Sequence, residues 1–283
     1  MVLMQSCKTE EDTYSPDFGF DYLELRVGKY IVYEVDSTIY DPTGDTSVFF
    51  SKTFFKEEIT DTLLDNNGEI LYRTERFERK AEGDPWQVTK VFTQSVQGSQ
   101  GIITEDNLRF VKMNFPPRKF ASWDGTVHFD NSIIVSVAGE SLEMFKGWRS
   151  RITELGEPDS IGNFVFDNVL TLREADNESN IEYRYSIEKY AKGIGLAYRE
   201  RWILDTQKCQ EDCQVFENNF NDCIADCIAL IPSPTQADST QCESQCGGEF
   251  LDFNLCQENC NALPWDEKAQ KGFILKQTII EFN

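Results

Sequence analysis

Two stretches of this chain carry the same cysteine pattern, and this duplication constrains the fold more than any other feature. "CQEDCQVFENNFNDCIADC" spans residues 209–227, and "CESQCGGEFLDFNLCQENC" spans residues 242–260. In both, three, nine and three residues separate successive cysteines. Residues three or four positions apart share one face of an α-helix, so the cysteines of each copy line a stripe typical of a coiled-coil seam. Each copy therefore predicts a helix.

Two such helices in an antiparallel hairpin would place their stripes face to face. The connecting "IALIPSPTQADSTQ" contains Pro232 and Pro234, which suit a turn between helices and not the interior of one. The facing stripes predict disulfides that join Cys209 to Cys260, Cys213 to Cys256, Cys223 to Cys246, and Cys227 to Cys242.

The ninth cysteine, Cys7, lies in the opening sequence "MVLMQSCKTEED". A short apolar stub and a small residue before the cysteine resemble the end of a bacterial lipoprotein signal peptide, in which the cysteine is acylated. The acidic run after it resembles the surface-export signal of Bacteroidota lipoproteins. The segment lacks a basic region, and its apolar stretch is shorter than the usual ~7–15 residues. We expect lipidation (palmitate) at Cys7; the alternative is an unmodified cysteine near the start of the chain.

Two other uses of the eight repeated cysteines stay open at this stage. Each repeat could close on itself, pairing Cys209 with Cys227 and Cys213 with Cys223, and the glycine pair at 247–248 would help the second copy bend. Four-cysteine sets also hold zinc or iron–sulfur clusters. We expect disulfides and no bound metal, because an exported chain matures in an oxidising compartment where disulfides form and persist.

The paired repeats resemble twin CX9C helical hairpins. Nine residues lie between Cys213 and Cys223, and nine between Cys246 and Cys256. The resemblance implies a helical hairpin only. The four additional cysteines depart from that family, so it implies no role in copper handling or import.

The remainder of the chain has the patterning of β-strands. Asn67-Gly68 between apolar runs is a strong hairpin signal. "IEYRYSIE", residues 181–188, alternates apolar and polar residues as a half-buried strand does. Similar runs predict a mainly β fold: an antiparallel curved sheet, barrel-like or a sandwich, with the disulfide-stapled α-helical hairpin inserted. We expect a signal remnant and tether over 1–18, a β domain over 19–205 plus 271–283, and the inserted hairpin over 206–270.

Parts of this β domain resemble a family of uncharacterised Bacteroidota outer-membrane lipoproteins. The similar segments are "FDYLELRVGKYIVYEVDSTIYD", "KFASWDG" and "YAKGIGLAYRERW". The resemblance covers most of residues 18–205 and 271–283 and leaves out the cysteine insertion. It implies a β-rich fold and a location in the cell envelope, and it supplies no catalytic residues.

Charge and composition narrow the function classes further. The chain has 49 acidic and 27 basic residues, a net charge of −22, which disfavours contact with nucleic acid. The single histidine, His128, precedes Asp130 by two positions, and in a strand both would share a face. A lone histidine beside aromatic residues is more often a packing residue, so we expect no catalytic residues, no enzyme activity and no cofactor.

Two functions are consistent with these observations. The first is a non-catalytic accessory subunit at the outer membrane, on its cell-surface or periplasmic side. It would be held by its lipid anchor and would present the stapled arm to an envelope or outer-membrane protein, within a larger transport or assembly complex. The alternative is a carrier that binds a hydrophobic or glycan ligand in the cleft of the curved sheet.

Overall fold

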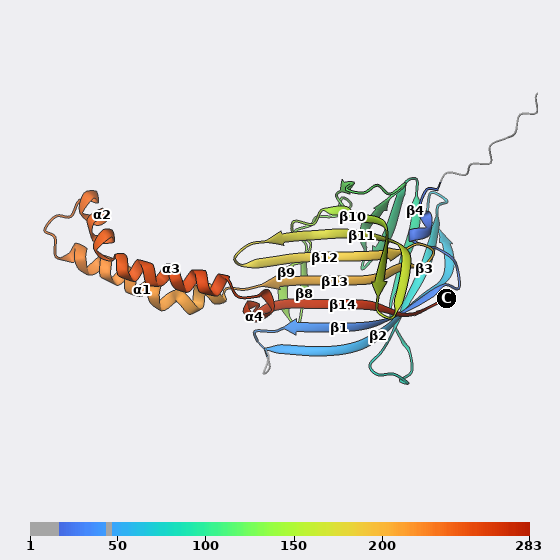
Figure 1. Ribbon diagram of the computed structural model, residues 1–283, viewed down its shortest axis with the longest axis horizontal. Helices are drawn as coiled ribbons and strands as arrows, with labels where there is room; N and C mark the ends of the chain where they lie inside the picture. Colours follow the sequence, from blue (N-terminus) through green and yellow to red (C-terminus); the bar gives the residue numbers. More distant parts are fainter. Residues whose placement is uncertain (1–16, 44–46) are drawn as a thin grey trace, which may run out of the picture.

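The computed structural model describes residues 17–43 and 47–283, and most of these residues build one antiparallel sheet (Figure 1). Twelve strands follow one another across it in the order β6-β5-β4-β3-β2-β1-β14-β13-β12-β11-β10-β7. They are β1 (Tyr30–Tyr40), β2 (Val48–Leu64), β3 (Ile70–Arg79), β4 (Gln87–Gln97), β5 (Gln100–Glu105), β6 (Leu108–Asn114), β7 (Ser122–Trp123), β10 (Ser150–Ile161), β11 (Phe164–Glu178), β12 (Glu182–Ala191), β13 (Gly195–Asp205) and β14 (Lys271–Phe282).

Two smaller features also belong to the β domain. A second sheet contains only β8 (Ile134–Val137) and β9 (Glu140–Glu143), and the short 3-10 helix η1 (Phe20–Tyr22) precedes β1. The hairpin of β8 and β9 packs against the large sheet through a shared apolar cluster that includes Leu142, Phe145 and Ile203. The fold class is therefore the predicted one, a mainly β domain with a curved antiparallel sheet.

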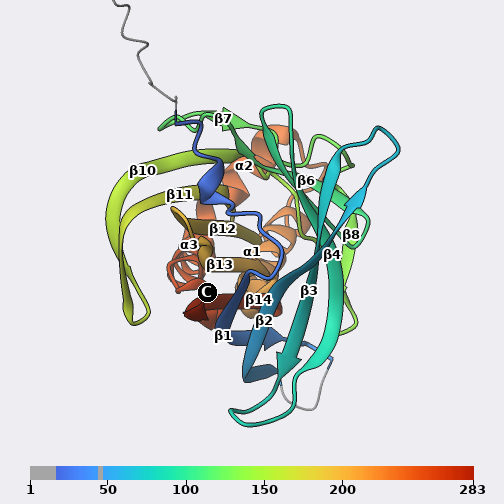
Figure 2. The same ribbon diagram turned by 90° about the vertical axis from the view of Figure 1, so that its right-hand side faces the viewer.

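The large sheet curls until its two edge strands approach each other, and Figure 2 shows it bent around an interior. The contact between β6 and the β7 region is direct. The backbone N–H of Val111 donates to the carbonyl of Gly125 at 2.9 Å, and the indole Nε1 of Trp123 donates to the carbonyl of Val111 at 2.8 Å. Strand twist makes such curling natural for a sheet of this many strands.

The Asn67-Gly68 signal correctly located the hairpin between β2 and β3. Asp65 Oδ1 accepts hydrogen bonds from the backbone N–H groups of Asn67 and Glu69, at 2.8 and 2.9 Å. Gly68 has a φ of 81°, which glycine adopts without the steric cost of a Cβ. Local turn chemistry thus fixes this connection.

The alternating strand β12 buries the face that its sequence would leave outside. Arg184 and Glu188 are 1% and 0% exposed, whereas Tyr183 and Tyr185 on the other face are half-buried. Hydropathy predicts the opposite orientation, because burying charge is costly unless every charge is paired. The interior of the curled sheet supplies that pairing. On the other face, Tyr183 stacks on Tyr185 and Trp265 and meets Trp202 edge to face.

The cysteine segment is inserted between β13 and β14 and projects beyond one end of the sheet (Figure 1). It contains α1 (Lys208–Ala229), α2 (Gln236–Gln245), α3 (Gly247–Asn261) and α4 (Trp265–Lys268). We call residues 208–262 the arm. Its four disulfides are Cys209–Cys260, Cys213–Cys256, Cys223–Cys246 and Cys227–Cys242, the pairs of the antiparallel hairpin and not those within each repeat.

The second repeat is not the single helix expected over 242–260. It divides at Cys246, so that α2 begins earlier, at Gln236, and α3 begins at Gly247. Thr235 explains the early start, because it forms a capping box with Asp238. The glycine pair at 247–248 has the low helix propensity expected where a helix bends. Figure 1 shows α3 lying along α1 while α2 turns away from it.

The chain returns from the arm to the sheet through α4, which belongs to the β domain. Trp265 is buried with Tyr40, Leu204 and Ile274, and its Nε1 donates to Glu178 Oε1 at 2.7 Å. The position of α4, where the arm joins the β domain, therefore depends on packing against the sheet and not on the disulfides. No helix among the described residues is both long and apolar enough to cross a membrane.

We predict that the sheet folds without the arm, provided that α4 is kept. The Cα atoms of Cys209 and Cys260 are 5.4 Å apart, so a two-residue Gly-Asn turn can join these two residues in place of residues 210–259. This deletion should retain the strand signal in far-ultraviolet circular dichroism. Loss of the strand signal in the deletion variant would show that the arm is part of the core.

In the full chain, Trp265→Ala should lower the free energy of unfolding by about 3–5 kcal/mol in urea titrations, the usual cost of truncating a buried tryptophan.

Candidate functional site

The interior of the curled sheet contains a cavity of about 490 Å³. Strands β1 to β6 form one wall, β13 and β14 form the other, and the hairpin of β8 and β9 contributes Ile134 and Val135. Ligand pockets are typically about 300–1,000 Å³ and lie in the mouths of curled sheets among other places. The cavity is thus large enough for a small molecule, and we treat it as the candidate site.

Much of the cavity surface is apolar. Aromatic and aliphatic side chains reach it from both walls, and several are only half-buried, so apolar surface faces the open volume. Among these half-buried residues are Phe55, Phe110, Met144, Phe273 and Leu275. Such a surface gains free energy when an apolar group covers it, by about 25 cal/mol per Å² removed from water.

Charged side chains also line the cavity, and they form two clusters. The first lies on β2 to β5 and the turn after β5. Arg76 donates from Nε to Glu57 at 2.9 Å and from Nη1 to Glu105 at 3.0 Å, while Lys90 contacts Glu105 at 3.0 Å and Asp106 at 2.7 Å. Burial alone would raise the pKa of Glu105, but Arg76 and Lys90 outweigh it and lower that pKa to about 2.

The second cluster joins strands that are far apart in sequence. Glu188 on β12 accepts from Lys112 of β6 at 2.9 Å, from Arg199 of β13 at 2.8 Å and from Arg201 of β13 at 3.3 Å. Lys112 also contacts Glu174 of β11, which accepts from Arg201 at 3.2 Å. Burial alone would raise the pKa of Glu188, but Lys112 and Arg199 outweigh it and hold that pKa well below its usual range.

Two polar side chains on the cavity wall are less well paired. Lys29 is only 6% exposed, and its Nζ donates to the carbonyl of Leu23 at 3.1 Å; within the described ranges no carboxylate lies within 4.0 Å of it. Burial lowers the pKa of Lys29 to about 8. Gln277 is 1% exposed; its Oε1 accepts from Arg199 Nη1 at 3.2 Å, and its Nε2 has no hydrogen-bond acceptor in the described part of the chain.

Sequence reasoning offered a ligand cleft in the curved sheet as its alternative function but named none of the residues of this site. A usable signal was present in "YRERW" on β13, where Arg199 and Arg201 share the inward face, and in "YRYSIEKY" on the neighbouring strand β12, where Glu188 lies on the buried face. Charged residues two apart in neighbouring strands predict an ion-paired face as readily as a solvated one. Only the pairing across the interior decides between these two possibilities.

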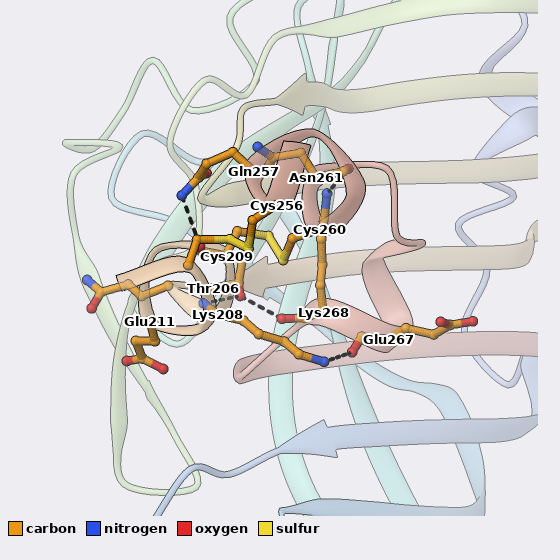
Figure 3. Close-up of a disulfide and its surroundings, with 12 residues drawn as sticks. Thr206, Lys208, Cys209, Glu211, Cys256, Gln257, Cys260, Asn261, Glu267 and Lys268 are labelled. Atoms are coloured by element: carbon orange, nitrogen blue, oxygen red, sulfur yellow. Dashed lines mark hydrogen bonds between the residues drawn. A yellow bond between two sulfur atoms is a disulfide. The ribbon is translucent and has the colours of Figure 1, made fainter. Parts of the chain in front are cut away.

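The arm meets the β domain through a short polar base, shown in Figure 3. Thr206 Oγ1 donates to the carbonyl of Lys268 at 2.6 Å, and Lys208 Nζ donates to the carbonyl of Glu267 at 3.2 Å (Figure 3). Gln257 Nε2 donates to the carbonyl of Cys209 at 3.0 Å and so ties α3 to α1 beside the first disulfide. Because all eight cysteines of the arm are in disulfides, none is available as a metal ligand.

Two other residues singled out in the sequence lie away from the cavity. His128 is exposed in a turn and not in a strand, so strand alternation does not place it beside Asp130. Asp130 Oδ1 instead accepts from the backbone N–H and the hydroxyl of Ser132, at 2.9 and 2.8 Å. The expectation that His128 is a packed strand residue was wrong for the same reason. Cys7 lies outside the described residues.

No protein-family model and no curated protein matches the sequence. Two crystal structures resemble the fold. One is a "putative exported protein with YmcC-like fold" from Bacteroides fragilis, with a TM-score of 0.33 and 9% identity. The other is a "putative lipoprotein" from Parabacteroides distasonis, with a TM-score of 0.29 and 12% identity. Each match covers 64% of this chain and 91% of the other, and at these scores it assigns neither a family nor a function.

We predict that the second cluster is essential to stability. Glu188→Ala leaves the buried Arg199 without its carboxylate partner and leaves Lys112 and Arg201 with Glu174 alone, so it should lower the free energy of unfolding by about 3–5 kcal/mol. Lys189→Ala is the matched control, because Lys189 is the next residue on β12 and its ion pair with Asp159 lies near the surface. It should cost about 0–1 kcal/mol. Urea denaturation of the two variants makes the comparison, and equal effects would contradict a special role for the cluster.

Proposed function

We propose that this protein is a non-catalytic binding protein that carries a small ligand inside its curled sheet. The observation that supports this most directly is the 490 Å³ cavity, which combines half-buried apolar side chains with a few fixed polar groups. Ligand sites usually have this composition, because apolar surface supplies affinity while a few polar groups orient the ligand. This was the alternative function in the sequence analysis, and the geometry favours it over the accessory role.

The pairing of the two carboxylates Glu105 and Glu188 argues against their use as general acids or bases and so supports binding. General acid or base chemistry needs a group that changes protonation near the working pH and is free to reach the substrate. Glu105 and Glu188 instead have lowered pKa values and accept from two or more cations each. They stay ionised at neutral pH and are committed to holding Arg76, Lys90, Lys112 and Arg199 in place.

We further propose that the protein works in the bacterial cell envelope, at the outer membrane, with Cys7 as its lipid anchor. The sequence around Cys7 supports the anchor, and the arm supports the compartment. Four disulfides in a surface-exposed arm persist only where the surroundings are oxidising. A single acyl chain holds a protein only weakly to a membrane, so the acylated cysteine would need more than one chain for stable attachment.

A second role, contact with a protein partner in the envelope, is favoured by the arm. It stands clear of the sheet in Figure 1 and exposes apolar side chains, among them Val215, Leu251 and Leu255. The disulfides keep it ordered before any encounter, which lowers the entropy cost of binding. We propose this as a second function that is compatible with ligand carriage.

The cavity predicts a specific effect of filling it. Leu275→Trp places a larger ring in the cavity, whereas Ile280→Trp places the same ring on an exposed position of the same strand, β14. Small molecules that co-purify with the folded chain should be detected by mass spectrometry after organic extraction. They should be lost from Leu275→Trp and kept by Ile280→Trp. A chain that carries no small molecule, or that carries it equally in both variants, would contradict the proposed carriage.

The anchor predicts where the chain is found in cell fractions. Cys7→Ser removes the acylated atom, so the protein should move from the membrane fraction to the soluble fraction of the envelope. Ser6→Ala is the control, because it leaves Cys7 and a small residue before it. Immunoblots of fractionated cells make the comparison. An unchanged distribution of the Cys7→Ser variant would contradict lipidation at this residue.

A further inference from the structure

We propose that the cavity binds an aliphatic carboxylate, with its headgroup beside Gln277 and Arg199 and its hydrocarbon chain along the apolar wall. This inference rests on the proposed ligand carriage and adds the chemical class of the ligand. It follows from three independent features of the cavity: one unpaired donor, an excess of positive charge and an uncovered apolar surface.

The unpaired donor is the amide nitrogen of Gln277. Arg199 can only donate hydrogen bonds, so the Gln277 atom 3.2 Å from its Nη1 must be the carbonyl Oε1. This fixes the orientation of the amide and leaves Nε2 as a donor with no acceptor among the described residues. A buried donor without a partner costs about 1–3 kcal/mol. A ligand oxygen at this point would satisfy it, and Arg199 would be the adjacent cation.

The charges inside the sheet favour an anion. Among the described residues, six cations line the cavity: Lys29, Arg76, Lys90, Lys112, Arg199 and Arg201. The carboxylates on the wall or paired directly with these cations number five: Glu57, Glu105, Asp106, Glu174 and Glu188. The formal excess is one positive charge, in a chain whose net charge is −22. One negative charge on the ligand would balance the interior, and a carboxylate provides it.

The apolar wall determines the rest of the ligand. On β14, Phe273 and Leu275 precede Gln277 on the same inward face, and both are only half-buried. Phe110 and Met144 belong with Phe273 to one apolar cluster. A chain that starts at Gln277 can therefore run along this surface and cover it. The volume of about 490 Å³ lies in the lower part of the usual range of ~300–1,000 Å³, which suits one chain and not a two-chain lipid.

The experiment compares dodecanoate with dodecanol by isothermal titration calorimetry on the delipidated, disulfide-bonded chain. The two molecules share a hydrocarbon chain and differ in headgroup charge. Dodecanoate should bind at least tenfold more tightly. Gln277→Met removes the unpaired donor and should weaken dodecanoate binding about 10- to 100-fold, as for a hydrogen bond to a charged group. Gln94→Met is the matched control, because Gln94 also lines the cavity but already donates to Thr74 Oγ1 at 3.0 Å; it should change binding less than threefold.

A second variant tests the charge separately from the hydrogen bond. Lys29→Met removes the cation that has no carboxylate partner in the described ranges, while keeping a long side chain that packs well. It should narrow the preference for dodecanoate over dodecanol, and it should leave dodecanol binding unchanged. Circular dichroism and urea denaturation of each variant establish that the sheet is folded before the titrations are compared.

The possible results separate this inference from the proposed function. Equal binding of acid and alcohol, unaffected by Gln277→Met, would overturn the carboxylate inference and leave ligand carriage standing. The same holds if neither molecule binds while another small molecule co-purifies and is lost from Leu275→Trp. If neither binds and nothing co-purifies, both proposals are overturned. Tight dodecanoate binding that is weakened by Gln277→Met and by Leu275→Trp supports both.

Discussion

The interior of this protein depends on one shared carboxylate. Glu188 is fully buried and accepts from Lys112, Arg199 and Arg201, which reach it from β6 and β13. Removing these charges from water is costly, so the arrangement is stable only while every partner is in place. Lys112 comes from the edge strand β6, and its bond to Glu188 therefore holds the curl of the sheet. The approach of β6 to β7 and the walls of the cavity both require that curl.

Polar pairing inside the sheet also explains why the protein has a cavity at all. Apolar side chains of an ordinary core collapse onto one another until few voids remain. Here the charged clusters fix the positions of Arg76 and Arg199 through directional bonds, so the surrounding side chains cannot close the space between them. The same bonds hold the amide of Gln277 in one orientation. A site built this way is ordered before its ligand arrives, which reduces the entropy cost of binding.

The arm and the sheet are stabilised by different physical means. Most of the arm helices are solvated, with few side chains buried besides the cysteines, so covalent links replace the missing core. The sheet has four apolar clusters, and one of them includes Trp265 at the foot of the arm. The arm therefore ends at residue 262, eight residues before the expected 270, because α4 packs with the sheet. Ligand carriage and partner contact can therefore reside in separate parts of one chain.

The sequence alone determined the features that depend on local geometry. The repeated cysteine spacing predicted an antiparallel hairpin through α-helical periodicity and two prolines, but the disulfides of the structure were needed to exclude closure of each repeat on itself. Asn67-Gly68 located a turn by its backbone preference. Alternation identified β12 as a strand but misplaced its buried face. Hydropathy predicts that charged side chains are exposed, and it cannot indicate that Arg184 and Glu188 form ion pairs with residues of other strands. The break at Cys246 was missed although its signals are local, namely the capping box of Thr235 with Asp238 and the glycine pair at 247–248. His128 was misplaced because it lies in a turn and not in a strand. Only the tertiary structure decided the cavity, its excess charge and the unpaired amide of Gln277. These features form when strands as distant as β6 and β14 face each other across the curled sheet, and the residue pattern along a single strand cannot indicate which strands will do so.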